Sequence, residues 1–69
     1  MPSSHKAVFT YDEEDEAWLV RFPAHQGCAT YGRTLDEARA NAIEALQVWL
    51  DVKAVLIDED VHPHTAAAG

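Results

Sequence analysis

The chain has 69 residues, of which 12 are acidic and 5 are Lys or Arg, giving a net charge of −7, and it contains one cysteine. This length allows one small domain over residues 1–69, and a single cysteine excludes an internal disulfide. The charge argues against direct nucleic-acid binding, which depends on clustered Lys and Arg, and no stretch approaches the roughly 18 apolar residues of a membrane span.

The first half of the sequence predicts a β-hairpin. Residues 6–11, KAVFTY, and residues 17–22, AWLVRF, are rich in β-branched and aromatic side chains that alternate as in half-buried strands. Residues 12–16, DEEDE, join them, and because this acidic loop lacks glycine we expect an open connection built around a type I turn. Alternation groups six apolar side chains on shared strand faces: Ala7, Phe9, Tyr11, Trp18, Val20 and Phe22.

A third strand is predicted over residues 28–31, CATY, because Pro23 ends the second strand and Gly27 precedes the new run. We interpret Cys28 as a small buried hydrophobe, since free cysteine is among the most buried residue types. His25 lies three positions away, but no carboxylate motif orients it as the base that a nucleophilic cysteine needs.

A helix is predicted to begin at Thr34. In the T-x-x-E pattern that follows, the threonine side chain accepts the N–H of Glu37, and the glutamate returns to the N–H of Thr34, which is a capping box. The sequence thus predicts an α+β domain, with one main helix on a three-stranded antiparallel sheet and room for a short element after the helix. We expect an ordered core over residues 6–57 and flexible ends. One apolar stripe should cover the sheet: Leu35, Ala38, Ala42, Leu46, Trp49 and Leu50.

The helical pattern changes after residue 47, where Val48, Val52 and Val55 fall on the side that should face water. Either the helix ends near residue 53 and a separate element follows, or its last turns are apolar all round because a second chain covers them. A domain this short has a thin core, which favours the second explanation. We therefore predict a homo-oligomer, a dimer or tetramer, with these three valines in the subunit contact.

Two chemical alternatives are weaker. His25 and Cys28, followed by His62 and His64, could supply four zinc ligands if the tail folded back, but histidines near a terminus are usually solvated. A two-metal nuclease needs convergent carboxylates, whereas the acids here lie in a loop and on the outer helix face. We expect no metal, no cofactor and no enzymatic activity. Trp18, Phe22 and Trp49 are expected to pack together in the core rather than to stack nucleic-acid bases.

The combined spacing of several short segments is more specific than any of them alone. It comprises a tyrosine before an acidic loop, Phe22-Pro23, Gly27-Cys28, Thr30, Gly32, Thr34-Leu35, Glu37-Ala38, Asn41-Ala42, Ala45-Leu46 and Trp49-Leu50. Over residues 9–50 the chain resembles the N-terminal domain of the HicB family of antitoxins. The resemblance implies a partial ribonuclease H fold, an oligomer, and a partner: the small basic toxin HicA, which cuts mRNA.

An acidic module suits a surface built to grip RNA, so inhibition by occlusion is expected. The resemblance does not assign contact residues; the charge pattern predicts partner binding by Asp12, Glu13, Glu14, Asp15 and Glu16, with Glu44 and Asp51 second. Many family members continue into a DNA-binding domain, whereas this chain ends at Gly69, so operator binding is not expected of it. The alternative is an orphan oligomeric scaffold or small-ligand binder. A cytoplasmic location is expected, because the N-terminus lacks a signal-peptide pattern.

Overall fold

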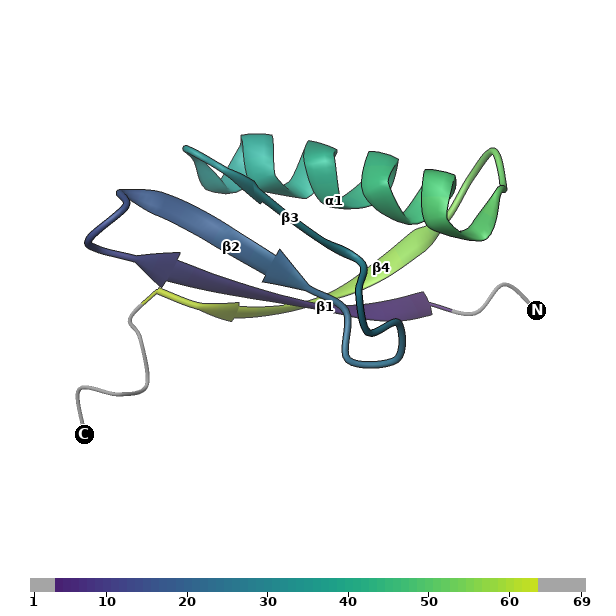
Figure 1. Cartoon of the computed structure of the whole chain (residues 1–69), viewed down its shortest axis with the longest axis horizontal. Coiled ribbons are helices and arrows are strands. Elements are labelled where there is room, and N and C mark those ends of the chain that lie inside the picture. The colour runs from purple at the N-terminus through teal and green to yellow at the C-terminus, as the bar shows by residue number, and fades with distance from the viewer. Residues whose placement is uncertain (1–3, 64–69) are drawn as a thin grey trace.

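A computed structural model describes residues 4–63 of the chain. Strands β1 (Ser4–Asp12), β2 (Ala17–Arg21) and β3 (Ala29–Gly32) are followed by helix α1 (Leu35–Leu50) and strand β4 (Leu56–His62) (Figure 1). The predicted α+β class, the hairpin and the third strand are confirmed. The expected ordered core covered residues 6–57, whereas β1 begins at Ser4 and β4 continues to His62. Of the expected flexible ends, residues 1–3 and 64–69 lie outside the described part.

The sheet has four strands in the order β3-β2-β1-β4, so the prediction of a three-stranded antiparallel sheet was wrong. β1 pairs with β2 and β2 with β3 antiparallel, but β4 lies parallel to β1, with Ala7 opposite Glu59. A parallel neighbour needs a crossover connection, and α1 supplies it by returning the chain to the start of β1. β4 was missed because three consecutive acids interrupt its apolar residues.

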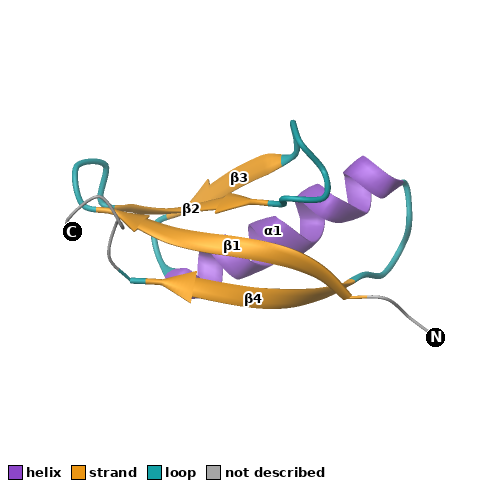
Figure 2. Ribbon diagram, turned by 90° about the horizontal axis from the view of Figure 1, so that it is seen from below, coloured by secondary structure: helices purple, strands orange, loops and turns teal. Residues whose placement is uncertain are grey.

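α1 covers one face of the sheet, as Figure 2 shows from below, with the sheet in front of the helix. The sheet contributes Ala7, Phe9 and Val20 to the core, in agreement with the predicted alternation, and Phe22 joins them directly after β2. The helix contributes Ala38, Ala42 and Leu46, none of them exposed. Trp49 is an exception, because 49% of it is exposed, so it does not join Trp18 and Phe22 in the core. Trp18 instead contacts Tyr11, with ring centroids 5.3 Å apart.

The start of α1 agrees with the prediction. The Thr34 hydroxyl accepts the N–H of Glu37 at 3.0 Å, and the Glu37 carboxylate accepts the N–H of Arg33 at 3.1 Å, one residue before the N–H expected. Gly32 lets the helix approach β3, because a Cβ there would lie 2.6 Å from Cα of Ala38.

The end of α1 contradicts the explanation that we favoured. The helix stops at Leu50, and Asp51 takes a left-handed conformation with φ 57°. The N–H of Val52 then donates to the carbonyl of Gln47 at 3.0 Å, which closes the helix C-terminus. Val52 and Val55 therefore lie in the connection to β4, not on further helical turns. The described residues contain no helix long and apolar enough to cross a lipid bilayer.

Candidate functional site

The acidic loop, residues 12–16, turns β1 into β2 without a glycine. The Asp12 carboxylate accepts the backbone N–H of Glu14 at 3.0 Å and that of Asp15 at 3.4 Å, a side-chain turn that aspartate often makes. Glu16 then adopts φ 51°, the left-handed conformation that glycine usually supplies. Residues 13–16 are exposed, so the backbone geometry presents their carboxylates to solvent.

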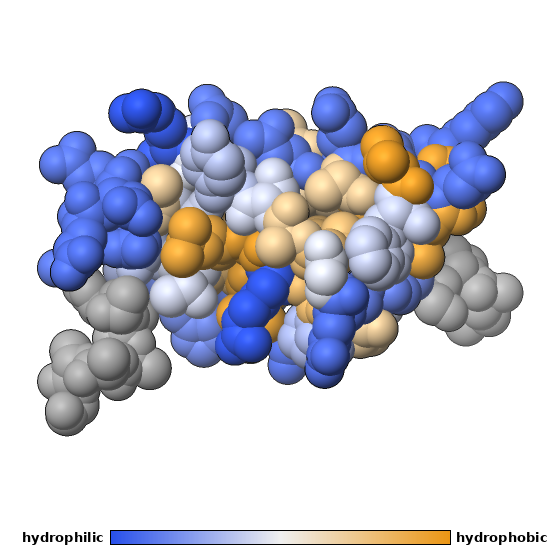
Figure 3. Space-filling model, in the orientation of Figure 1, coloured by the Kyte–Doolittle hydropathy of each residue, from blue (hydrophilic) through white to orange (hydrophobic). Residues whose placement is uncertain are grey.

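The start of the helix adds acids beside this loop. Gly32, just before α1, lies opposite Trp18 of β2, close to the loop, so Asp36 and Glu37 in the first helical turn lie at the same end of the molecule. We call the acidic loop with these two residues the acidic end. Figure 3 shows hydrophilic surface gathered at the end of the molecule that carries the β1–β2 loop.

Among the described residues, three of the seven acids outside the loop, Asp36, Glu59 and Asp60, have a cation partner. Arg39 donates to Asp36 at 2.7 Å and makes a two-pronged contact with Glu59 on β4. These contacts, the one with Glu59 first, raise the pKa of Arg39 above its ordinary value. Asp60 contacts His62 at 3.0 Å and Lys6 at 3.7 Å. The sequence did not predict the contacts of Arg39 with Glu59 or of Asp60 with Lys6, because β4 was not predicted.

The acidic loop differs from the rest of the described chain because four consecutive acids, residues 13–16, are all exposed. Within residues 4–63, no Lys or Arg forms an ion pair with Glu14, Asp15 or Glu16. Their charge is exposed and uncompensated, and such charge can speed the approach of a basic partner. The loop is therefore the strongest candidate for electrostatic recognition.

The seven residues predicted to bind a partner do not form one patch. Five lie in the acidic loop, Glu44 is exposed on α1, and Asp51 caps the far end of the helix. A helix of 16 residues is about 24 Å long, so Asp51 is remote from the loop.

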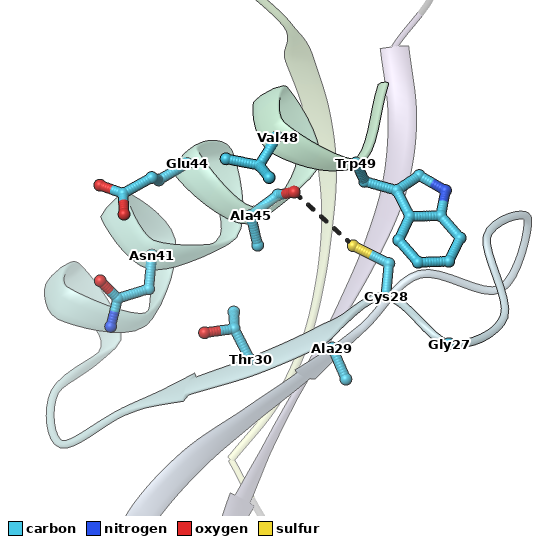
Figure 4. A pocket seen from close by; sticks show the side chains of 9 residues that line it. All are labelled: Gly27, Cys28, Ala29, Thr30, Asn41, Glu44, Ala45, Val48 and Trp49. Atoms are coloured by element: carbon cyan, nitrogen blue, oxygen red, sulfur yellow. Dashed lines mark hydrogen bonds between the residues drawn. The ribbon is translucent and has the colours of Figure 1, made fainter. Parts of the chain in front are cut away.

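A groove of about 350 Å³ lies between β3 and α1 (Figure 4). Trp49 covers Gly27 at one end of it, and Asn41 and Glu44 lie toward the other. The Cys28 thiol faces the carbonyl of Ala45 at 3.9 Å. Only 6% of Cys28 is exposed, which confirms its interpretation as a buried hydrophobe, and burial raises the pKa of its thiol.

The histidines do not gather around Cys28. His62 lies at the end of β4, opposite Thr10, whereas His25 contacts His5 near the start of β1. His64 lies outside the described residues. Among residues 4–63, no group of three His, Cys, Asp or Glu side chains could hold a metal ion. The alternative zinc site is therefore not assembled from the described members of that set.

The opposite end of the molecule exposes apolar side chains. Val48 is 76% exposed, Val52 is 43% exposed and Val55 packs partly against the core. Trp49 and Leu56 are also about half exposed. We call Val48, Trp49, Val52 and Leu56 the apolar end. Exposed apolar surface of this kind is typical of protein contacts, and the subunit contact stays a prediction.

Comparison with known proteins identifies the family. Residues 6–68 match the sequence model of the family described as HicB_like antitoxin of bacterial toxin-antitoxin system. The chain is also 34% identical over 47 residues to a UPF0150 protein of Archaeoglobus fulgidus, and this region covers 68% of each chain. No solved structure matches the chain. The chain thus belongs to the HicB-like antitoxin family.

Proposed function

We propose that this protein neutralises a small basic ribonuclease toxin of the HicA type by covering its RNA-binding face. The family implies a toxin partner in general. The observation that supports a basic one is the exposed loop in which Glu14, Asp15 and Glu16 have no cation partner within residues 4–63. Occlusion by these carboxylates needs no chemistry from the antitoxin, so we propose that it is not an enzyme and acts in the cytoplasm.

The acidic loop suits this task because the Asp12 carboxylate orders its backbone. Asp12 is engaged with the backbone of the loop, which leaves the next side chains facing outward. A surface that grips RNA carries clustered Lys and Arg, and a projecting row of carboxylates can occupy the places of the phosphates. Such steering raises the association rate and weakens with salt.

The experiment compares two double variants of equal charge. Glu14→Gln with Asp15→Asn removes two charges from the loop, and Glu44→Gln with Asp51→Asn removes two from α1 and its cap. Association with a purified ribonuclease of the HicA type would be followed by surface plasmon resonance at several salt concentrations. We expect the loop variant to associate roughly tenfold more slowly, with a flatter salt dependence, and the helix variant to change less.

Two results would contradict the proposal. Equal slowing in the two variants would mean that net charge alone matters and that the loop is not the contact. Failure of the wild-type chain to bind or inhibit the ribonuclease would favour the orphan scaffold or small-ligand binder.

We also propose that the chain is a homo-oligomer joined through the apolar end. Four large apolar side chains are exposed there, on a domain whose small size limits its own core. The acidic end would then stay free in each subunit, because it lies at the opposite end of α1.

A further inference from the structure

Two histidines far apart in the sequence contact each other. Nδ1 of His5 lies 3.2 Å from Nε2 of His25, and the ring centroids are 5.2 Å apart with the planes inclined by 46°. His5 belongs to β1, and His25 lies in the connection between β2 and β3. Both residues are half-buried, so solvent reaches the pair.

The backbone fixes both residues. The N–H of His25 donates to the carbonyl of Phe22 at 2.9 Å, and the N–H of Cys28 donates to the carbonyl of His25 at 3.0 Å. His5 is paired with Ile57 of β4 within the sheet. A ligand that binds both rings therefore orders little additional backbone, which is the condition for a preorganised site.

The separation of the two nitrogens suits a shared metal ion. A neutral imidazole has one N–H and one lone pair, so in direct contact one ring donates to the other. A metal ion would instead accept a lone pair from each. With Zn–N distances of about 2.0–2.1 Å, two nitrogens on a tetrahedral ion lie about 3.3–3.4 Å apart, close to the separation here.

We propose that Nδ1 of His5 and Nε2 of His25 together bind a divalent transition-metal ion such as Zn²⁺, with water completing its coordination. Imidazole nitrogen is a ligand that suits zinc, copper and nickel. The bound ion joins the β2–β3 connection to the first strand. This site is independent of the toxin partner and of the acidic end.

The neighbouring side chains limit the proposed site to two protein ligands. Cys28 is not a ligand, because its thiol is buried and faces the Ala45 carbonyl. Within residues 4–63, no third His, Cys, Asp or Glu joins the pair in a metal-holding group. A site with two protein ligands binds less tightly than a four-ligand structural zinc site.

The test is a titration of the metal-free full chain with zinc chloride. Side-chain ¹⁵N spectra should show saturable shifts at Nδ1 of His5 and Nε2 of His25. With free zinc at tenfold the dissociation constant, the midpoint of thermal unfolding should rise by roughly 5–10 °C. His5→Ala and His25→Ala should each weaken binding by about tenfold or more. His62→Ala and Cys28→Ser serve as controls that retain binding.

Three outcomes would overturn the proposal: no saturable shift in the two rings up to about 1 mM zinc, binding that survives unchanged in both alanine variants, or binding lost equally in the two controls. His25→Gln keeps a polar side chain of similar reach, and circular dichroism of each variant separates lost metal binding from lost folding.

Discussion

The two ends of α1 differ in the chemistry of their exposed side chains, which are acidic at one end and apolar at the other. At the acidic end, Glu14, Asp15 and Glu16 are exposed without a Lys or Arg partner among the described residues, and hydrogen bonds of Thr34, Glu37 and Asp12 hold the backbone. At the apolar end, the backbone is closed by Asp51, and Val48 and Trp49 remain exposed. The helix is capped by Thr34 at one end and by Asp51 at the other. The exposed acidic and apolar side chains therefore lie on ordered backbone. The two ends correspond to the two contacts that we propose, one with a basic partner and one between subunits.

The largest expected effect is a loss of unfolding free energy when glycine is replaced by alanine, and it should differ between Gly32, near the acidic end, and Gly27, near the apolar end. Gly32→Ala would place a Cβ 2.6 Å from Cα of Ala38, where only backbone could move, so we expect a loss of about 3 kcal/mol or more in unfolding free energy. Gly27→Ala meets the movable Trp49 side chain at 3.3 Å but must keep φ 99°, so a loss of roughly 1–2 kcal/mol is expected. Urea denaturation would rank them, and equal losses would show that the helix does not approach β3 as described.

The next effect concerns assembly. Val48→Asp places a charge on the apolar end, and because Val48 is 76% exposed the monomer should still fold. We expect the dissociation constant of the oligomer to rise by at least about tenfold, measured by light scattering across protein concentrations. Ala40→Asp introduces the same charge at another exposed position of α1 and should leave assembly unchanged. An oligomer equally stable in both variants would remove Val48 from the contact.

A smaller effect is expected from the helix cap. Thr34→Ala removes the hydroxyl that accepts the N–H of Glu37, at a cost of about 1 kcal/mol. Thr34→Ser keeps that hydroxyl and should lose much less. Thermal unfolding of the two variants would measure the difference, and a neutral Thr34→Ala would mean that the capping bond adds no stability to the acidic end.

The smallest effect depends on pH. The hydrogen bond with His62, aided by the charges of His62 and Lys6, lowers the pKa of Asp60. A lowered carboxyl pKa stabilises the fold above the unfolded-state value, and that stability is lost as the pH falls through the folded-state pKa. We expect Asp60→Asn to reduce the loss of stability between neutral and strongly acidic pH. Unchanged acid unfolding curves would show that this exposed cluster contributes nothing measurable.

Much of the fold could be predicted because it depends on local patterns. Alternation placed Phe9 and Val20 on the core face, and the T-x-x-E pattern located the start of α1. β4 could not be predicted this way, since its acids are stabilised by residues distant in sequence. The contacts of Arg39 with Glu59 and of His5 with His25 each span twenty positions.

The sequence by itself determined the three antiparallel strands, the helix start, the burial of Cys28 and the negative charge. The tertiary structure decided where the helix ends, that a fourth strand lies parallel to the first, which acids lack cation partners and which histidines meet. Side-chain period and capping act over a few residues and can be read along the chain. Pairing across the sheet depends on the crossover through α1, which brings residues together only when the whole domain has folded.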